Sequence, residues 1–398
     1  MPLRLPRFFR KRRAPRRELA DFAYLCSGNG GDCTLNHVTA LRAGGEAFPA
    51  MLEAITRAQR SIELETYILR ADRIGQRFQA ALCERARAGV AVRVLYDAVG
   101  SFTLSAKFVS ELAEAGVRVA EFRPIAPWRA RWGLNRRDHK KMLILDGGLA
   151  FVGGLNIGDE YCALEDGGGG WHDAVARVEG PAVRELAALF AETWRDAGGD
   201  EIPALPEAAR AAPASGDVAV HVLANSGLVS RPRMRRAYLR AIRRAEKTIC
   251  IMNAYFIPDR TLRRAFAHAA QRGVSVRVIV PSRSDLHPVY YASRHLYPRL
   301  LRSGVRIFEW QGAMMHAKLA VIDGVWSTIG SYNLDRRSFV HNLEVALLMI
   351  DRELGQALER HFASDLESCT EISLADFERR PLWQSLLERV WYALRFWL

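Results

Sequence analysis

Two histidines in this chain stand in the same short pattern of residues. The pattern His-x-Lys-x-x-x-x-Asp occurs twice, and its polar residues are His139, Lys141, Asp146, His316, Lys318 and Asp323. A neutral imidazole can attack phosphorus, and a protonated one can give its proton to a leaving alkoxide. Lysines can neutralise the charge on the non-bridging oxygens of a phosphodiester. The doubled pattern therefore predicts an enzyme that breaks and remakes phosphodiester bonds through a covalent histidine intermediate.

The choice of lysine supports this interpretation. Only six of the 57 basic residues are lysine, and the rest are arginine. Two of these six lysines occupy the two equivalent positions of the motif. A compact ammonium group, in place of the planar guanidinium fork, is therefore expected to be needed there.

Further polar residues follow each motif in the same order. Asn156 and Asn333 each lie 17 residues after their histidine, behind a Gly-Gly or Gly-Ser pair, and their amides can donate to a phosphate oxygen. Asp173 and Glu344 then begin expected strands. A carboxylate that accepts from the far ring nitrogen of a histidine fixes its tautomer and supports the imidazolium.

Each of these residues has an ordinary structural explanation when it is taken alone. A single His-x-Lys is usual in an exposed strand, an Asn after Gly is usually a turn residue, and Asp146 and Asp323 are more often structural than catalytic. The presence of the whole set twice, in the same order, favours function. The other histidines lack this context. The six cysteines include no Cys-x-x-Cys pair, so no metal site and no cofactor is predicted.

The positions of the motifs follow from an internal repeat. Residues 54–68, 87–97, 113–122 and 139–147 correspond in order to 241–255, 271–281, 301–310 and 316–324. Helical segments alternate with strands, which predicts a mostly parallel sheet with helices on both faces. We expect two similar α/β/α sandwich domains, at 46–202 and 218–370, related by a pseudo-twofold axis with the active site at their interface. A basic arm and lead-in (1–45), a linker (203–217) and a tail (371–398) complete the expected organisation.

Composition and charge indicate a globular protein with an anionic partner. Hydrophobic residues make up 49% of the chain and charged residues 25%, as in globular proteins, and the net charge is +13. Such a charge attracts polyanions, and both nucleic acid and anionic lipid fit it. No apolar run reaches the about 18–20 residues that span a bilayer. The first 17 residues carry eight basic side chains without a following apolar run, so they predict either a solvated arm or a segment held at an anionic membrane, and no secretory signal.

The C-terminal tail has a helical stripe of large apolar residues. Its members are Trp383, Leu386, Leu387, Val390, Trp391, Leu394, Trp397 and Leu398, whereas Glu388, Arg389 and Arg395 lie off the stripe. Two interpretations remain open. The stripe either lies in a membrane interface or closes the core of the protein.

The doubled motif resembles the paired HKD motifs of the phospholipase D superfamily, over roughly residues 46–365. Within it the chain is similar to bacterial cardiolipin synthases of the B type, which lack N-terminal transmembrane helices. That similarity is carried by ETYIL (65–69), NAYFIPD (253–259), GSYNLDRRSF (330–339), NLE (342–344) and RPLW (380–383). It implies a phospholipase D-like fold for each domain.

The resemblance also implies an activity. A phosphatidyl group would pass from one phosphatidylglycerol to another through a phosphatidyl-histidine, without a metal, and glycerol would be released. His139 would be the nucleophile and His316 the general acid. The implied partners are phosphatidylglycerol and an anionic membrane surface, with no nucleic acid, and the implied location is peripheral at the cytoplasmic face of the bacterial membrane. The alternatives are a hydrolytic phospholipase D, a metal-independent nuclease or a non-catalytic lipid-binding scaffold.

Overall fold

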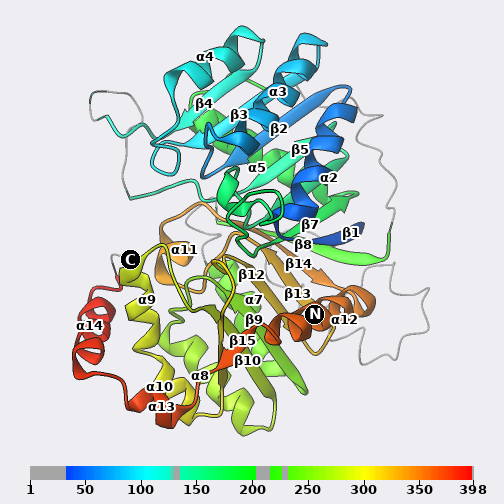
Figure 1. Ribbon diagram of the computed structural model, residues 1–398. Coiled ribbons are helices and arrows are strands. Elements are labelled where there is room, and N and C mark those ends of the chain that lie inside the picture. The colour runs from blue at the N-terminus through cyan, green and yellow to red at the C-terminus, as the bar shows by residue number, and fades with distance from the viewer. Residues whose placement is uncertain (1–32, 127, 129–134, 203–215, 226–231, 397–398) are drawn as a thin grey trace.

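The computed structural model describes residues 33–126, 128, 135–202, 216–225 and 232–396 (Figure 1). The predicted basic arm at the N-terminus, most of the predicted linker at 203–217, and Trp397 and Leu398 of the tail lie outside these described residues. The domain boundaries stay a prediction.

The described chain contains two runs of elements in the same order. The first repeat comprises β1 (Thr34–Arg42), α2 (Ala43–Arg57), β2 (Ser61–Thr66), α3 (Arg73–Arg87), β3 (Ala91–Asp97), α4 (Ala106–Glu114), β4 (Arg118–Phe122), β5 (Met142–Leu145), β6 (Leu149–Gly153), β7 (Ala174–Glu179) and α5 (Ala182–Asp196). The second repeat comprises β8 (Val218–Ala224), α7 (Pro232–Arg244), β9 (Thr248–Asn253), α8 (Arg260–Gln271), β10 (Ser275–Pro281), α9 (His287–Arg294), α10 (Tyr297–Arg302), β11 (Arg306–Trp310), β12 (Lys318–Ile322), β13 (Trp326–Gly330), α11 (Arg336–Val340), β14 (Val345–Ile350) and α12 (Arg352–Leu366). The chain continues into β15 (Cys369–Glu371), α13 (Leu374–Glu378) and α14 (Leu382–Ala393).

All of these strands belong to one sheet of 15 strands. The first repeat contributes the order β4-β3-β2-β5-β6-β7-β1, and the second repeats it in mirror order as β8-β14-β13-β12-β9-β10-β11. The equivalent strands β1 and β8 meet in the middle and pair antiparallel, with Thr34 opposite Val220. Antiparallel pairing of equivalent strands is the arrangement that a twofold axis produces, so the mixed α/β fold with duplicated domains agrees with the prediction.

The direction of the strands differs from the prediction of a mostly parallel sheet. Among the described strands, only the sets β2-β3-β4 and β9-β10-β11 pair in parallel, and the other pairings are antiparallel. The reason lies in the connections. Helices α3 and α8 carry the chain back between parallel strands, whereas β5 and β6 are joined by a turn too short for a crossover.

Three apolar cores hold the layers together. Helices α2, α3 and α4 cover one face of the first repeat, and α7, α8 and α10 cover the equivalent face of the second (Figure 1). The third core lies between the repeats, where Met142 and Val152 of the first share a cluster with Leu319 and Ile329 of the second. This shared core fixes the two repeats against each other.

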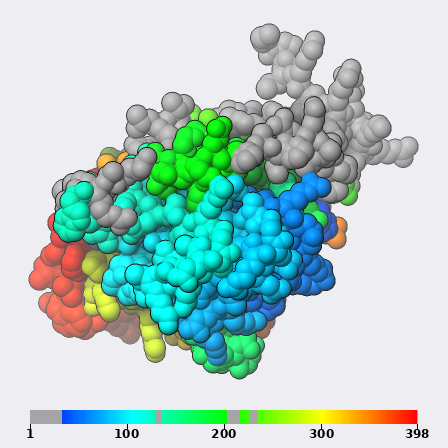
Figure 2. Space-filling view, turned by 90° about the horizontal axis from the view of Figure 1, so that it is seen from above, coloured from blue at the N-terminus to red at the C-terminus, as the bar shows by residue number. Residues whose placement is uncertain are grey.

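The C-terminal helices lie at the periphery of the molecule. Seen from above, the first repeat fills most of the visible face, and the C-terminal segment (red) protrudes at one edge (Figure 2). None of the helices in the described part of the chain combines the length and apolarity needed to cross a membrane.

Candidate active site

His139 and His316 line one cleft between the repeats. Its volume is about 570 Å³, and both imidazoles are largely buried in its floor. Its remaining walls come from both repeats: Tyr67, Ile68, Arg70, Arg137, Asn156, Glu160, Tyr161 and Trp171 from the first, and Tyr255, Asp285, Leu286, Val289, Asn333, Asp335, Arg337, Ser338 and Asn342 from the second. The duplicated histidines therefore share a single cleft.

Each histidine is paired with a carboxylate of the other repeat. His139 Nδ1 lies 3.0 Å from Glu344 Oε2, and His316 Nδ1 lies 2.7 Å from Asp173 Oδ2. A carboxylate accepts a hydrogen bond from the ring, so each Nδ1 carries the proton and each Nε2 is left for chemistry. The sequence predicted Asp173 and Glu344 as partners of the histidines, but it did not predict that each pair joins one repeat to the other.

Backbone hydrogen bonds hold the crossed pairs in place. The amide of His139 donates to the carbonyl of Leu343 over 2.9 Å, and the amide of His316 donates to the carbonyl of His172 over 2.7 Å. In both cases the carbonyl that accepts from the histidine amide belongs to the residue immediately before the carboxylate that the histidine ring binds. His139 lies before β5 and His316 lies before β12, so both histidines stand outside the strands.

The two motif lysines lie behind the histidines. Lys141 Nζ donates to the carbonyl of His139 over 2.7 Å, and Lys318 Nζ donates to the carbonyl of His316. Both lysines are buried, and the residues that line the cleft include neither of them. Their charge therefore acts on the floor of the cleft from beneath.

Burial and charge set the protonation of these groups. Burial, with the charges of Lys141 and Lys318, holds the pKa of His139 well below its usual value, and burial and Lys318 also lower the pKa of His316. Burial also lowers the pKa of Lys141 to about 7 and that of Lys318 to about 8. Both imidazoles are therefore mainly neutral near pH 7 in the free protein.

The two carboxylates differ in charge state. Burial raises the pKa of Glu344 to about 7. Burial acts in the same direction on Asp173, but the hydrogen bond and charge of His316 outweigh it and leave the pKa of Asp173 below its usual value. His316 thus faces an ionised carboxylate, and an imidazolium at His316 is better compensated than one at His139.

The motif aspartates lie at the far ends of their strands. The carboxylate of Asp146 accepts from the backbone amides of residues 59–61, and that of Asp323 accepts from those of residues 246–248. Both have a positive φ, 53° and 55°, at the turn that leaves the strand. They tie the end of a helix to the start of the next strand and do not line the cleft, so their place in the structure is that of turn residues.

The two predicted asparagines do line the cleft. Asn156 Nδ2 donates to the hydroxyl of Tyr161 over 2.6 Å, and its Oδ1 accepts from the amide of Ile68. Asn333 is buried at the equivalent position of the second repeat. Their role in binding phosphate stays a prediction.

Sequence reasoning missed the aromatic residues around the histidines. Tyr67 lies 5.0 Å from the His139 ring, and Tyr161 and Trp171 lie 5.5 and 5.8 Å from the His316 ring, measured between centroids. Tyr255 stands 6.5 Å from His316. The sequence contained a sign of these residues. Tyr67 and Tyr255 lie at the ends of the matching segments 54–68 and 241–255, one position apart when the two segments are aligned.

An ion pair that prepares the segment before His139 was also missed. Arg137 is buried against Asp97, with 2.9 Å between Nη2 and Oδ1, and Asp97 also accepts from the amide of Asp138. These contacts fix the approach of the chain to His139. Within the described residues, no group of three or more His, Cys, Asp or Glu side chains is arranged to hold a metal ion.

Comparisons with known proteins agree with the geometry. A family model described as cardiolipin synthase, PLD-like domain, matches residues 51–194 and 238–366. Cardiolipin synthase 2 of Bacillus anthracis is 36% identical over 356 residues, which cover 89% of this chain and 69% of the relative. Cardiolipin synthase of Geobacillus thermodenitrificans is 36% identical over 358 residues, covering 88% and 70%.

Among solved structures, phosphatidylserine synthase of Haemophilus influenzae shares the fold. Its TM-score is 0.72 at 15% identity, and the match covers 96% of this chain and all of that one. Polyphosphate kinase of Porphyromonas gingivalis matches with a TM-score of 0.55 at 12% identity, over 83% of this chain and 50% of that one. With two matched domains and relatives at this level of identity, the chain belongs to the cardiolipin synthase family of phospholipase D-like proteins.

Proposed function

We propose that the protein is a cardiolipin synthase that transfers a phosphatidyl group from one phosphatidylglycerol to another. The observation that carries the proposal is the pair of histidines in one cleft, each with its Nδ1 bound to a carboxylate, in a chain of this family. The same proposal places the enzyme peripherally at the cytoplasmic face of the membrane, where its lipid substrate is found. Lipid is therefore the expected partner, in place of nucleic acid.

The proposed reaction has two steps of opposite sense. Nε2 of neutral His139 attacks the phosphorus of the first phosphatidylglycerol, the bond from phosphorus to the glycerol oxygen breaks, and the minor, doubly protonated form of His316 gives its Nε2 proton to that oxygen. Glycerol leaves. A hydroxyl of the second phosphatidylglycerol then gives its proton to His316 and attacks phosphorus, and the bond from phosphorus to His139 breaks, which releases cardiolipin.

The electrostatic difference between the two sides supports this division of roles. His139 has a lowered pKa and a partner, Glu344, whose pKa is raised, so it favours the neutral, nucleophilic form. His316 faces the ionised Asp173, which stabilises the imidazolium that donates the proton. The buried ammonium groups of Lys141 and Lys318 stabilise the extra negative charge that develops at phosphorus.

The test is product analysis. Purified protein incubated with phosphatidylglycerol vesicles in EDTA should give cardiolipin and glycerol in equal amounts. Phosphatidic acid in place of cardiolipin would make the enzyme a hydrolytic phospholipase D. Cleavage of DNA without lipid turnover would assign it as a nuclease, and lipid binding without any product would leave a scaffold.

Activity should depend on pH in a window set by the lysines. Because the pKa values of Lys141 and Lys318 are lowered to about 7 and about 8, their positive charges are lost as the pH rises through this range. The imidazolium of His316 is also lost as the pH rises, because its pKa is lowered, so kcat/KM should already decline near pH 7 and should fall more steeply above about pH 7–8. His139 is protonated only well below its usual range, so the acid limb should lie below about pH 6.5.

The measurement is kcat/KM against pH with a short-chain, monomeric phosphatidylglycerol, which removes any effect of pH on vesicles. Lys141→Arg is the informative variant: its guanidinium does not replace the compact ammonium and should lower kcat/KM at every pH, but it keeps its charge, so the alkaline limb of the remaining activity should shift upward. A wild-type profile that stays flat to about pH 9 would contradict the role given to the lysines.

A further inference from the structure

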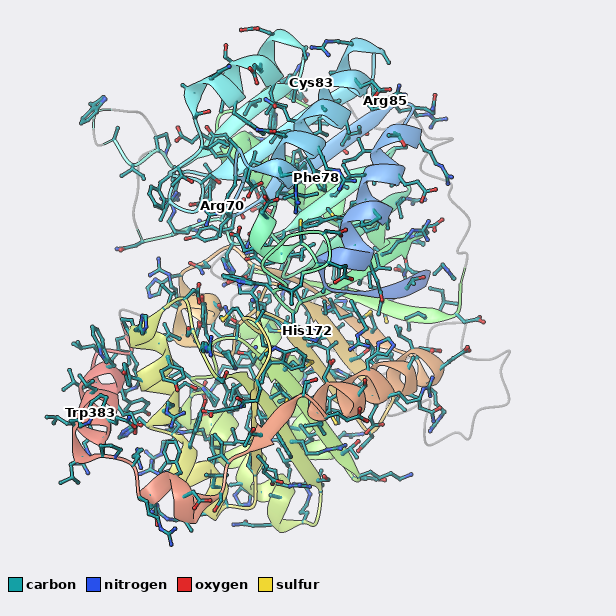
Figure 3. The ribbon with its side chains drawn as sticks, viewed as in Figure 1. Arg70, Phe78, Cys83, Arg85, His172 and Trp383 are labelled. Atoms are coloured by element: carbon teal, nitrogen blue, oxygen red, sulfur yellow. The ribbon has the colours of Figure 1, made fainter. Side chains whose placement is uncertain are left out.

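The C-terminal helix α14 is turned with its apolar side outward. Leu382, Trp383, Leu386, Val390 and Leu394 are between 43% and 89% exposed, whereas Glu388, on the opposite side of the helix, is fully buried. In Figure 3, Trp383 lies on α14 at the outer edge of the second repeat. An ordinary surface helix buries its apolar stripe, so this orientation is the reverse of the usual one.

Polar contacts hold the inner side of α14. Glu388 accepts hydrogen bonds from Arg380, over 2.8 and 3.0 Å, and lies 3.8 Å from Arg294. Arg263 donates to the hydroxyl of Tyr392 over 2.6 Å, and the Tyr392 ring stacks on His295 at 4.4 Å. These contacts fix which side of the helix faces the protein. Of the predicted stripe, Trp391 is the residue that packs partly against the core, and so most of the stripe does not close it.

Two arginines lie beside the exposed apolar face. Arg389 is exposed beside Val390, and Arg379 is exposed before the start of the helix. An apolar face with a basic rim fits a surface that is apolar inside and anionic at its boundary.

The helix lies beside the mouth of the cleft. It packs along α9, and the residues at the start of α9, Leu286 and Val289, line the cleft. Leu286 is itself 47% exposed. Just after the C-terminal end of α14, the ring of Phe396 lies under the Arg336 guanidinium at 4.9 Å, and the residue after Arg336, Arg337, lines the cleft.

We propose that the outer face of α14 docks the protein on an anionic lipid bilayer and so turns the mouth of the cleft toward the membrane. Charge complementarity favours this occupant over a second copy of the chain, because a symmetric contact through α14 would bring the same arginines face to face. Only the orientation of the cleft toward a lipid substrate rests on the proposed function. The docking itself is a property of the surface and can be measured without turnover.

The test is the double variant Leu386→Glu/Val390→Glu, which puts two charges in the centre of the apolar face and leaves Glu388 and Tyr392 in place. Binding to vesicles of phosphatidylglycerol and phosphatidylcholine should weaken about 100-fold, at roughly tenfold for each buried aliphatic side chain lost. Turnover of monomeric short-chain phosphatidylglycerol should stay within about twofold of wild type, which also shows that the variant is folded. Arg389→Gln should weaken binding about fivefold, and only when the vesicles are anionic.

The matched control is Leu164→Glu, which charges a leucine that is 67% exposed in the first repeat, outside α14. It should leave vesicle binding unchanged. Wild-type vesicle binding by the double variant would overturn the proposal. The proposal would also fail if the wild-type protein is a dimer, and the double variant is a monomer that still binds vesicles as wild type does. The apolar face would then be the contact with a second copy of the chain. If no lipid is turned over but the double variant still loses the vesicles, the proposed function fails and the docking surface stands.

Discussion

His139→Ala should lower the turnover of phosphatidylglycerol by about 10⁴-fold or more, because it removes the atom that forms the bond to phosphorus. Vesicle binding should survive, since His139 lies in the floor of the cleft and the proposed docking face lies on α14. Rates near those of wild type would refute the assignment of the nucleophile.

A substrate with a good leaving group separates the two histidines. A phosphatidyl ester of p-nitrophenol needs no proton on departure, so His316→Ala should still release about one equivalent of p-nitrophenol and then stall as the phosphatidyl-enzyme. His139→Ala should give no such burst. If the burst survives in His139→Ala and is lost in His316→Ala, the roles are reversed.

Asp173→Asn should lower turnover by about 10³–10⁴-fold while the fold stays intact. An amide at this position can donate to Nδ1 of His316, which moves the ring proton to Nε2, so that Nε2 has no lone pair to take the proton of the acceptor hydroxyl in the second step. It also removes the negative charge that supports the imidazolium. The activated substrate should recover much of the first step, because that step no longer needs the proton.

The chain contains a matched control for this variant. Asp365 binds His172 Nε2 over 3.1 Å, which is a histidine–carboxylate pair outside the cleft. Asp365→Asn removes a pair of the same chemistry, and its turnover should stay within about tenfold of wild type. Equal losses in the two variants would mean that Asp173 acts only through stability.

The parts of the site that were predictable are those with local spacing. His139, Lys141 and Asn156 stand in one stretch of sequence that recurs around His316, so a comparison of the chain with itself found both sets. Which carboxylate binds which histidine was not predictable, because the partners are 205 and 143 residues apart and come from opposite repeats. That pairing depends on how β1 and β8 join the repeats, and a strand's own sequence does not record which strand lies beside it.

The same limit applies to the sheet and the tail. Alternating residues indicated strands, but the direction of each strand is set by the length of its connection, and the short turn between β5 and β6 makes that pair antiparallel. Helical spacing found the residues of α14 that share a side. It did not show that this side faces outward, because the contacts of Glu388 with Arg380 and Arg294 join segments that are distant in the chain or separated by a turn.

The joining of both repeats in one chain has a consequence for how the site can diverge. A single repeat that assembled with its own copy would place identical groups beside both histidines. Here Ser331 donates to Glu344 over 2.5 Å, while the matching position is Gly154, where a Cβ atom would come within 2.3 Å of Asp173 Oδ1. Substitutions in one repeat are therefore not copied into the other. Because the two repeats are joined in one chain, the surroundings of the two histidines can differ, and each histidine can be adapted to its own role. In a symmetric dimer of identical subunits the two surroundings would have the same sequence.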